Sequence, residues 1–171
     1  LDEIRAEIKD EYTQPHNYPW VIGYSGGKDS TLVAHLVFDV IASLPKSERK
    51  RDIWICGNDT LVESPLVIGH LRNSINQIGA AASKLQVPIK TVLTKPGLED
   101  SFWVNLIGRG YPSPNRNFRW CTDRLKIRPT SNFIQERLSE EGRVILLLGV
   151  RKSESTLRAK TLKKYAHEGR L

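Results

Sequence analysis

The chain has 171 residues, enough for one domain, and its 39% hydrophobic and 26% charged residues are typical of a globular protein rather than a disordered one. Its longest apolar stretches, 31–44 and 144–150, are too short or too polar for a membrane span, so we expect no membrane partner. Two cysteines, Cys56 and Cys121, cannot build a disulfide framework, which indicates a reducing, cytoplasmic compartment. The sequence contains no methionine, even at its first position, so we expect further chain beyond Leu171.

Positive charge is concentrated in two parts of the chain. The net charge is +7, and the basic residues gather in 109–128 and 151–171, while the remainder is mildly acidic. This distribution suggests a polyanionic partner, either the phosphates of a nucleotide or a nucleic-acid backbone. A charge run alone is more often a solvated surface. The sequence around these residues is therefore needed to distinguish a binding site for a polyanion from such a surface.

Hydrophobic spacing predicts strands that alternate with helices. In chain order we expect a helix over 1–11, a strand over 20–24, a helix over 30–44, strands over 53–56 and 89–93 with a long helix over 65–85 between them, helices over 98–107, 120–127 and 129–141, and a strand over 143–148. This alternation predicts an α/β fold with a mostly parallel sheet and helices on both faces. We expect 1–19 to be an N-terminal helix and linker, and 20–171 to be the main domain.

The hexapeptide Ser25-Gly26-Gly27-Lys28-Asp29-Ser30 stands between a predicted strand and a predicted helix. Two glycines allow the backbone to approach an anion closely, and the start of the helix directs its dipole at the same point. The pattern is not a Walker A loop, which needs Gly-Lys-Ser/Thr. A simple capped turn is the alternative, but Lys28 opposes the helix dipole unless an anion is bound there.

This hexapeptide resembles the PP-loop of the ATP pyrophosphatases, which have the adenine nucleotide α-hydrolase fold and cleave ATP between its α and β phosphates. The resemblance implies that Ser25, Gly26, Gly27, Lys28, Asp29 and Ser30 bind ATP with Mg²⁺, and that Lys28 and Asp29 act in catalysis.

Two further segments resemble the PAPS reductase-like branch of this superfamily. The run from Asp59 to Glu63 resembles an Asp-Thr…Glu segment, which implies that Asp59 contacts the nucleotide and that both carboxylates bind Mg²⁺. The same residues would also suit a capped helix start. After the last predicted strand, Arg151 and Arg158 match a Gly-x-Arg-x-x-Glu-Ser-x-x-Arg element, which implies that both arginines hold phosphates and that Arg151 is catalytic.

The segments 100–112 and 118–127 resemble DndC, the PAPS reductase-like sulfurtransferase family of DNA phosphorothioation, with SspD as a close relative. Aromatic residues alternate there with basic ones, a mixture that suits nucleic-acid binding. The resemblance implies a catalytic role for Cys121, as a persulfide carrier or as a ligand of a [4Fe–4S] cluster completed by cysteines beyond this sequence. The predicted DNA-binding residues are Arg109, Arg116, Arg119 and Arg124.

The sequence therefore predicts an ATP-dependent sulfurtransferase of DNA phosphorothioation, with DNA, a cysteine desulfurase and other phosphorothioation subunits as partners, in a bacterial or archaeal cytoplasm. Two alternatives remain open at this point. One is a small-molecule enzyme such as a PAPS reductase or the small subunit of sulfate adenylyltransferase. The other is an ATP-binding interaction module without turnover, which release of pyrophosphate would exclude.

Overall fold

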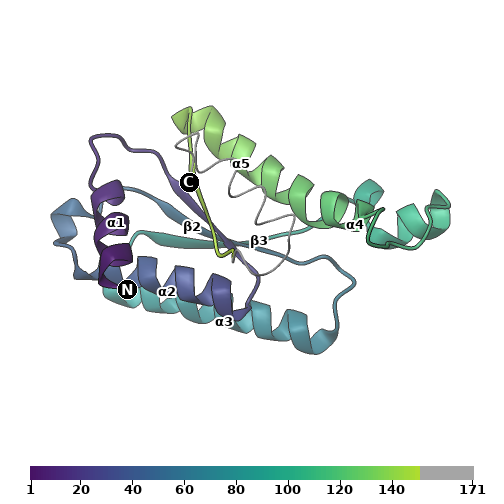
Figure 1. The fold of residues 1–171 in the computed structure, drawn as a ribbon, viewed down its shortest axis with the longest axis horizontal. Helices are drawn as coiled ribbons and strands as arrows, with labels where there is room; N and C mark the ends of the chain where they lie inside the picture. Colours follow the sequence, from purple (N-terminus) through teal and green to yellow (C-terminus); the bar gives the residue numbers. More distant parts are fainter. Residues whose placement is uncertain (151–171) are drawn as a thin grey trace.

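The computed structural model describes residues 1–150, which form one parallel sheet with helices on both faces (Figure 1). The strands are β1 (Trp20–Tyr24), β2 (Ile53–Asn58), β3 (Ile89–Thr94) and β4 (Ile145–Leu148). The helices are α1 (Asp2–Tyr12), α2 (Lys28–Ser43), α3 (Pro65–Leu85), α4 (Trp120–Thr122) and α5 (Arg128–Glu141). The strand order is β3-β2-β1-β4, and every neighbouring pair is parallel, so the predicted α/β fold class is confirmed.

Helices α2 and α3 lie side by side on one face of the sheet, with α1 packed beside α2 (Figure 1). The inward side chains of this face include Trp20 and Ile22 from β1 and Ile55 from β2, all buried. Strand residues alternate between faces, so this face receives every second side chain. The apolar spacing that predicts α2 and α3 places Val37 and Leu71 against these strands.

Helix α5 covers the opposite face (Figure 1). Its Phe133 packs with Val21 and Cys56, which are the alternate residues of β1 and β2, and its ring meets that of Trp54 edge-on at 5.3 Å. Burial raises the pKa of the Cys56 thiol above its ordinary value, so this cysteine is a small neutral core residue. The expectation that the sheet is covered on both faces holds.

The strand register brings the carboxyl ends of β1, β2 and β3 to one edge of the sheet. Tyr24 pairs with Gly57, and Asn58 pairs with Thr94. The chain adds β2 and β3 on one side of β1 and then β4 on the other, so the strand order reverses between β1 and β4. Ligands of open α/β sheets bind at such a reversal, outside the carboxyl ends of the strands.

Two predicted helices are less regular than expected. The segment predicted as a helix over 98–107 holds a 3₁₀ turn at Leu98–Asp100 and a wide π turn at Val104–Gly108. Asn105, within the π turn, is fully buried and donates its side-chain amide to the carbonyl oxygens of Glu99 and Ser101, which interrupts a regular helix. The segment 120–127 is one turn of α4 followed by a second π turn, Asp123–Ile127.

None of the helices within residues 1–150 is long and apolar enough to cross a membrane. The predicted phosphate-binding residues Arg151 and Arg158, and with them the second basic segment, lie outside the described residues.

Candidate functional site

The loop from Ser25 to Ser30 joins β1 to α2 at the reversal in strand order. Gly26 has a φ of +74°, a left-handed conformation that glycine adopts without strain. The hydroxyl of Ser30 is buried within the loop, where it donates to the carbonyl oxygen of Gly27 at 3.0 Å and accepts from the Ser25 N–H at 3.2 Å. The loop is therefore closed by hydrogen bonds of its own last residue.

No N-cap side chain covers the start of α2. Gly27 is the N-cap residue and has no side chain, so no N-cap oxygen accepts a hydrogen bond from the first helical turn. Lys28 is exposed and forms no ion pair with another described residue. A helix start without an N-cap side chain, the positive end of the helix dipole and a lysine together form an arrangement that binds phosphate groups.

Strand β4 ends against this helix start. A Cβ atom on Gly149 would lie 2.8 Å from the carbonyl oxygen of Asp29 and 3.0 Å from the backbone nitrogen of Ser30. Only glycine allows this approach, which brings the end of β4 next to the loop. Strand β4 thus ends beside the loop, and Arg151, which follows it in the sequence, lies outside the described residues.

The loop after β2 contributes Asp59, which is buried. One carboxylate oxygen accepts from the N–H of Leu61 at 3.1 Å, and the other accepts from Arg72 of α3 at 2.7 Å. The neighbouring Thr60 is 2% exposed, and its hydroxyl has no hydrogen-bond partner in the described structure. A buried hydroxyl without a partner at a ligand-binding edge fits a site that a bound molecule completes.

The predicted Mg²⁺ ligands are both engaged in ion pairs. Glu63 accepts from Lys126 at 3.2 Å, and Asp59 is bonded to Arg72 as described. Residues 1–150 contain no group of three or more His, Cys, Asp or Glu side chains placed to hold a metal. A magnesium ion carried by nucleotide phosphates needs only one or two carboxylates, so Asp59 or Glu63 would serve once its cation is displaced. The Mg²⁺ assignment stays a prediction.

The basic segment 109–128 divides into paired and unpaired arginines. The side chain of Arg124 is 16% exposed and donates to Asp100 and to the hydroxyl of Tyr111, while Arg109 donates to Glu99. Arg116 and Arg119 are exposed and form no ion pair with another described residue. DNA binding by all four stays a prediction, and the geometry favours Arg116 and Arg119 for it.

Aromatic side chains hold the same segment together. Trp120 is buried, stacks on Phe102 at 5.3 Å and donates its indole N–H to the Pro112 carbonyl oxygen, as expected for a core residue. Trp103 is 57% exposed and is therefore not a core residue. Phe118 is 42% exposed, so two aromatic side chains of this segment are accessible to solvent, as stacking on a base would require.

Cys121 lies in the first turn of α4 and is half-buried, whereas Cys56 is enclosed in β2. The described residues supply this one accessible thiol and no group of three or more metal-ligating side chains, so the predicted [4Fe–4S] cluster, which needs cysteines beyond this sequence, stays a prediction. A role for Cys121 as a sulfur carrier does not depend on a cluster and stays a prediction.

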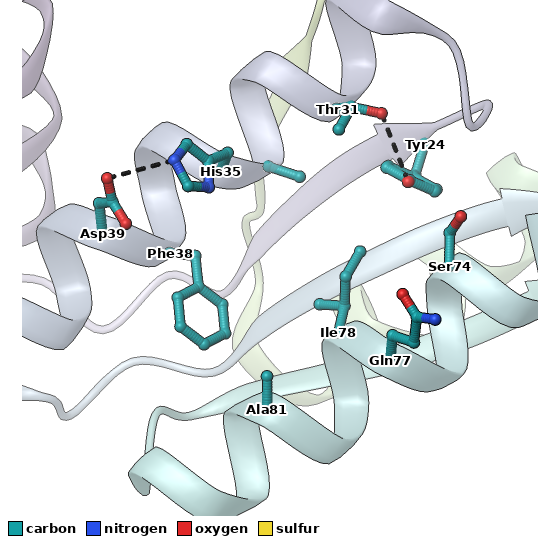
Figure 2. Close-up of a pocket in the computed structure, with 10 residues that line it drawn as sticks. Tyr24, Thr31, His35, Phe38, Asp39, Ser74, Gln77, Ile78 and Ala81 are labelled. Carbon is teal, nitrogen blue, oxygen red and sulfur yellow. Dashed lines mark hydrogen bonds and ion pairs between the residues drawn. The ribbon is translucent and has the colours of Figure 1, made fainter.

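A groove of about 430 Å³ lies between α2 and α3 (Figure 2). Its floor is apolar, with Phe38 and Ile78, and its polar edges carry the Thr31–Tyr24 hydrogen bond and the His35–Asp39 ion pair. None of the predicted site residues lines it. We therefore place the candidate site at the carboxyl edge of the sheet and not in this groove.

Two side chains from α3 contact the site loops and were missed by sequence reasoning. Arg72 binds Asp59, and Nε2 of His70 lies 3.3 Å from the carbonyl oxygen of Gly26. Nothing local in the sequence marks them, because they reach the loops only when α3 packs on the sheet.

No family model matches the chain. The uncharacterized protein MJ0066 of Methanocaldococcus jannaschii is 26% identical over 152 residues, which cover 89% of this chain and 26% of that protein, so the chain spans about a quarter of its length.

Two solved structures share the fold. The NH3-dependent NAD synthetase of Campylobacter jejuni, in complex with a nitrate ion, superposes with a TM-score of 0.53 and 14% identity over 90% of this chain and 56% of its own. The U34-tRNA thiolase NcsA of Methanococcus maripaludis, with its [4Fe–4S] cluster, superposes with a TM-score of 0.52 and 16% identity over 98% of this chain and 50% of its own. The chain thus has the α/β fold that these two enzymes share.

Proposed function

We propose that this chain is the nucleotide-binding part of an enzyme that cleaves ATP between its α and β phosphates and transfers the adenylyl group to an acceptor. The observation that carries the proposal is the glycine loop between β1 and α2, with a helix start that has no N-cap side chain and Lys28 at the reversal in strand order. The fold shared with the NAD synthetase and the tRNA thiolase supports this proposal, as does the unpartnered Thr60 hydroxyl just after β2.

The residues of the loop have defined tasks in such a reaction. Backbone N–H groups at the start of α2 and the ammonium of Lys28 hold the β and γ phosphate oxygens. An acceptor oxygen attacks the α phosphorus, and the bond to the β phosphate breaks with its electron pair leaving on pyrophosphate. Positive charge at the loop stabilises the negative charge that develops on this leaving group.

The acceptor that we favour is a backbone phosphate of DNA, activated for sulfur transfer as in DNA phosphorothioation. The resemblance of 100–112 and 118–127 to DndC supports it, as do the exposed Arg116, Arg119 and Phe118 beyond the carboxyl end of β3. A persulfide sulfur, supplied by a cysteine desulfurase and carried on Cys121, would attack the activated phosphorus and displace AMP. A thiol from a partner subunit would then reduce the remaining S–S bond.

Product analysis tests this function. The protein is incubated with ATP labelled at the α phosphate, with and without single- or double-stranded oligonucleotides, and we expect AMP and pyrophosphate as products. Lys28→Ala should lower turnover at least tenfold, while Lys84→Ala, an exposed lysine near the end of α3, should not. ADP as the sole product would exclude the mechanism, and ATP binding without any turnover would identify an interaction module. In a parallel incubation, sulfate replaces the oligonucleotides. Turnover with sulfate and not with DNA would identify the small-molecule enzyme.

A further inference from the structure

His70 contacts the centre of the candidate phosphate loop from the side of α3. Its Nε2 lies 3.3 Å from the carbonyl oxygen of Gly26, and its Cδ2 would be 3.3 Å from a Cβ atom at Gly26. A carbonyl oxygen only accepts hydrogen bonds, so Nε2 must carry the proton in this contact. The ring is exposed to solvent and contributes little to the core.

The contact matters because the peptide between Gly26 and Gly27 can point two ways. In a trans peptide the carbonyl and the N–H point in opposite directions. With the Gly26 oxygen held by His70, the Gly27 N–H faces the inside of the loop, 3.4 Å from the hydroxyl oxygen of Ser25. The flipped peptide would instead direct a carbonyl oxygen at an incoming phosphate, and two glycines permit that flip at little cost.

Helix α3, which carries His70, is held in place by its N-terminal cap and by its packing on the sheet. Its first turn is capped by Ser64, whose hydroxyl accepts from the Val67 N–H, and Leu71 and Ile75 are buried against the sheet. From the same two turns Arg72 binds Asp59. One helix therefore holds both loops at the carboxyl edge of the sheet.

We propose that His70 is a positioning residue that fixes the Gly26–Gly27 peptide in its anion-binding orientation. The inference rests on the proposed function, since it assumes that the loop binds nucleotide phosphates. His70 need not touch the nucleotide. It raises the fraction of molecules in which the Gly26–Gly27 peptide presents its N–H, and not its C=O, to the ligand.

Three variants separate the hydrogen bond from the packing of the ring. His70→Gln keeps an N–H donor, His70→Phe keeps a ring without a donor, and His70→Ala keeps neither. We expect ATP affinity, measured by calorimetry on the full chain, to fall about fivefold or more in His70→Phe and His70→Ala, and to recover most of this loss in His70→Gln. His35→Ala, which removes an exposed histidine of α2 that is paired with Asp39, is the matched control and should bind like the wild type.

The outcomes distinguish this proposal from the one on which it rests. If wild-type protein binds ATP and all three variants bind equally well, the positioning role is wrong while the nucleotide site stands. If His70→Phe binds like wild type and His70→Gln does not, the ring and not the donor matters, and the proposal is also wrong. A wild-type protein that binds no ATP overturns the proposed function itself.

Discussion

Gly149, at the end of β4, lies so close to Asp29, in the first turn of α2, that a Cβ atom on Gly149 would be 2.8 Å from both the carbonyl carbon and the carbonyl oxygen of Asp29. These two residues are far apart in the sequence and belong to the two strand–loop units on either side of the reversal in strand order. Their contact places the end of β4 beside the loop from Ser25 to Ser30. The position of this loop thus depends on a backbone contact that only glycine allows.

Gly149→Ala should loosen this contact. The new methyl group meets backbone atoms, which cannot move aside as the end of a side chain can, so we expect a loss of about 1–3 kcal/mol in stability. Thermal unfolding should begin several degrees lower, and ATP affinity should fall with it. Gly97→Ala is the control, because a Cβ atom there meets nothing within 4 Å. Equal melting temperatures for the two variants would contradict the packing described.

The arginines of 109–128 should separate into two classes when each is replaced by alanine. Arg119→Ala should weaken binding to an oligonucleotide and reduce the slope of log affinity against log salt by up to about one unit. Arg124→Ala should mainly lower the melting temperature, because it removes the hydrogen bonds to Asp100 and Tyr111. Fluorescence anisotropy across a salt series measures the first effect, and thermal unfolding the second. An Arg119→Ala variant that is less stable but binds normally would reverse this assignment.

Stability at alkaline pH should depend on Cys56. Burial holds the folded-state pKa of this thiol above its ordinary value of 9.0, so the folded chain keeps the proton that the unfolded chain loses. The contribution to stability is fully present below pH 9.0 and is lost as the pH rises from there through the folded-state pKa. Melting temperatures measured from about pH 8 to about pH 10 should fall less steeply in Cys56→Ala than in wild type. Cys121→Ala should retain the wild-type slope, and a Cys56→Ala protein that does so too would contradict the burial argument.

Much of the fold follows from local patterns in the sequence. The span of α3 matches its expected bounds because Ser64 and Pro65 mark its start and its apolar residues repeat at helical intervals. Strand β1 is equally clear, since an apolar run ends at a glycine pair. The irregular turns of 98–108 could not be foreseen, because they depend on Asn105 reaching two carbonyl groups that the fold brings close.

The sequence predicts where the loops of the candidate site lie, but it does not predict the contacts between these loops and α3. The Ser25–Ser30 loop has a local signature, so its position after β1 was predictable. His70 and Arg72 carry no signature, since they become site residues only through the packing of α3. The pairing of Arg124 with Asp100 likewise depends on segments 24 residues apart, and charge counting alone cannot tell such an arginine from the exposed Arg119.

Calorimetry of ATP binding to two glycine variants tests the central claim most directly. Gly27 and Gly97 have nearly the same extended backbone, with φ and ψ of −80° and 165° and of −62° and 161°, and a Cβ atom on either has no contact closer than 3.4 Å. Valine should therefore be tolerated by the fold at both positions, yet at Gly27 its branched side chain occupies the place where a phosphate must approach the backbone. We predict that Gly27→Val weakens ATP binding at least tenfold with an unchanged melting temperature, and that Gly97→Val binds like wild type. Unchanged affinity in a folded Gly27→Val protein would contradict the assignment of this loop as the phosphate site.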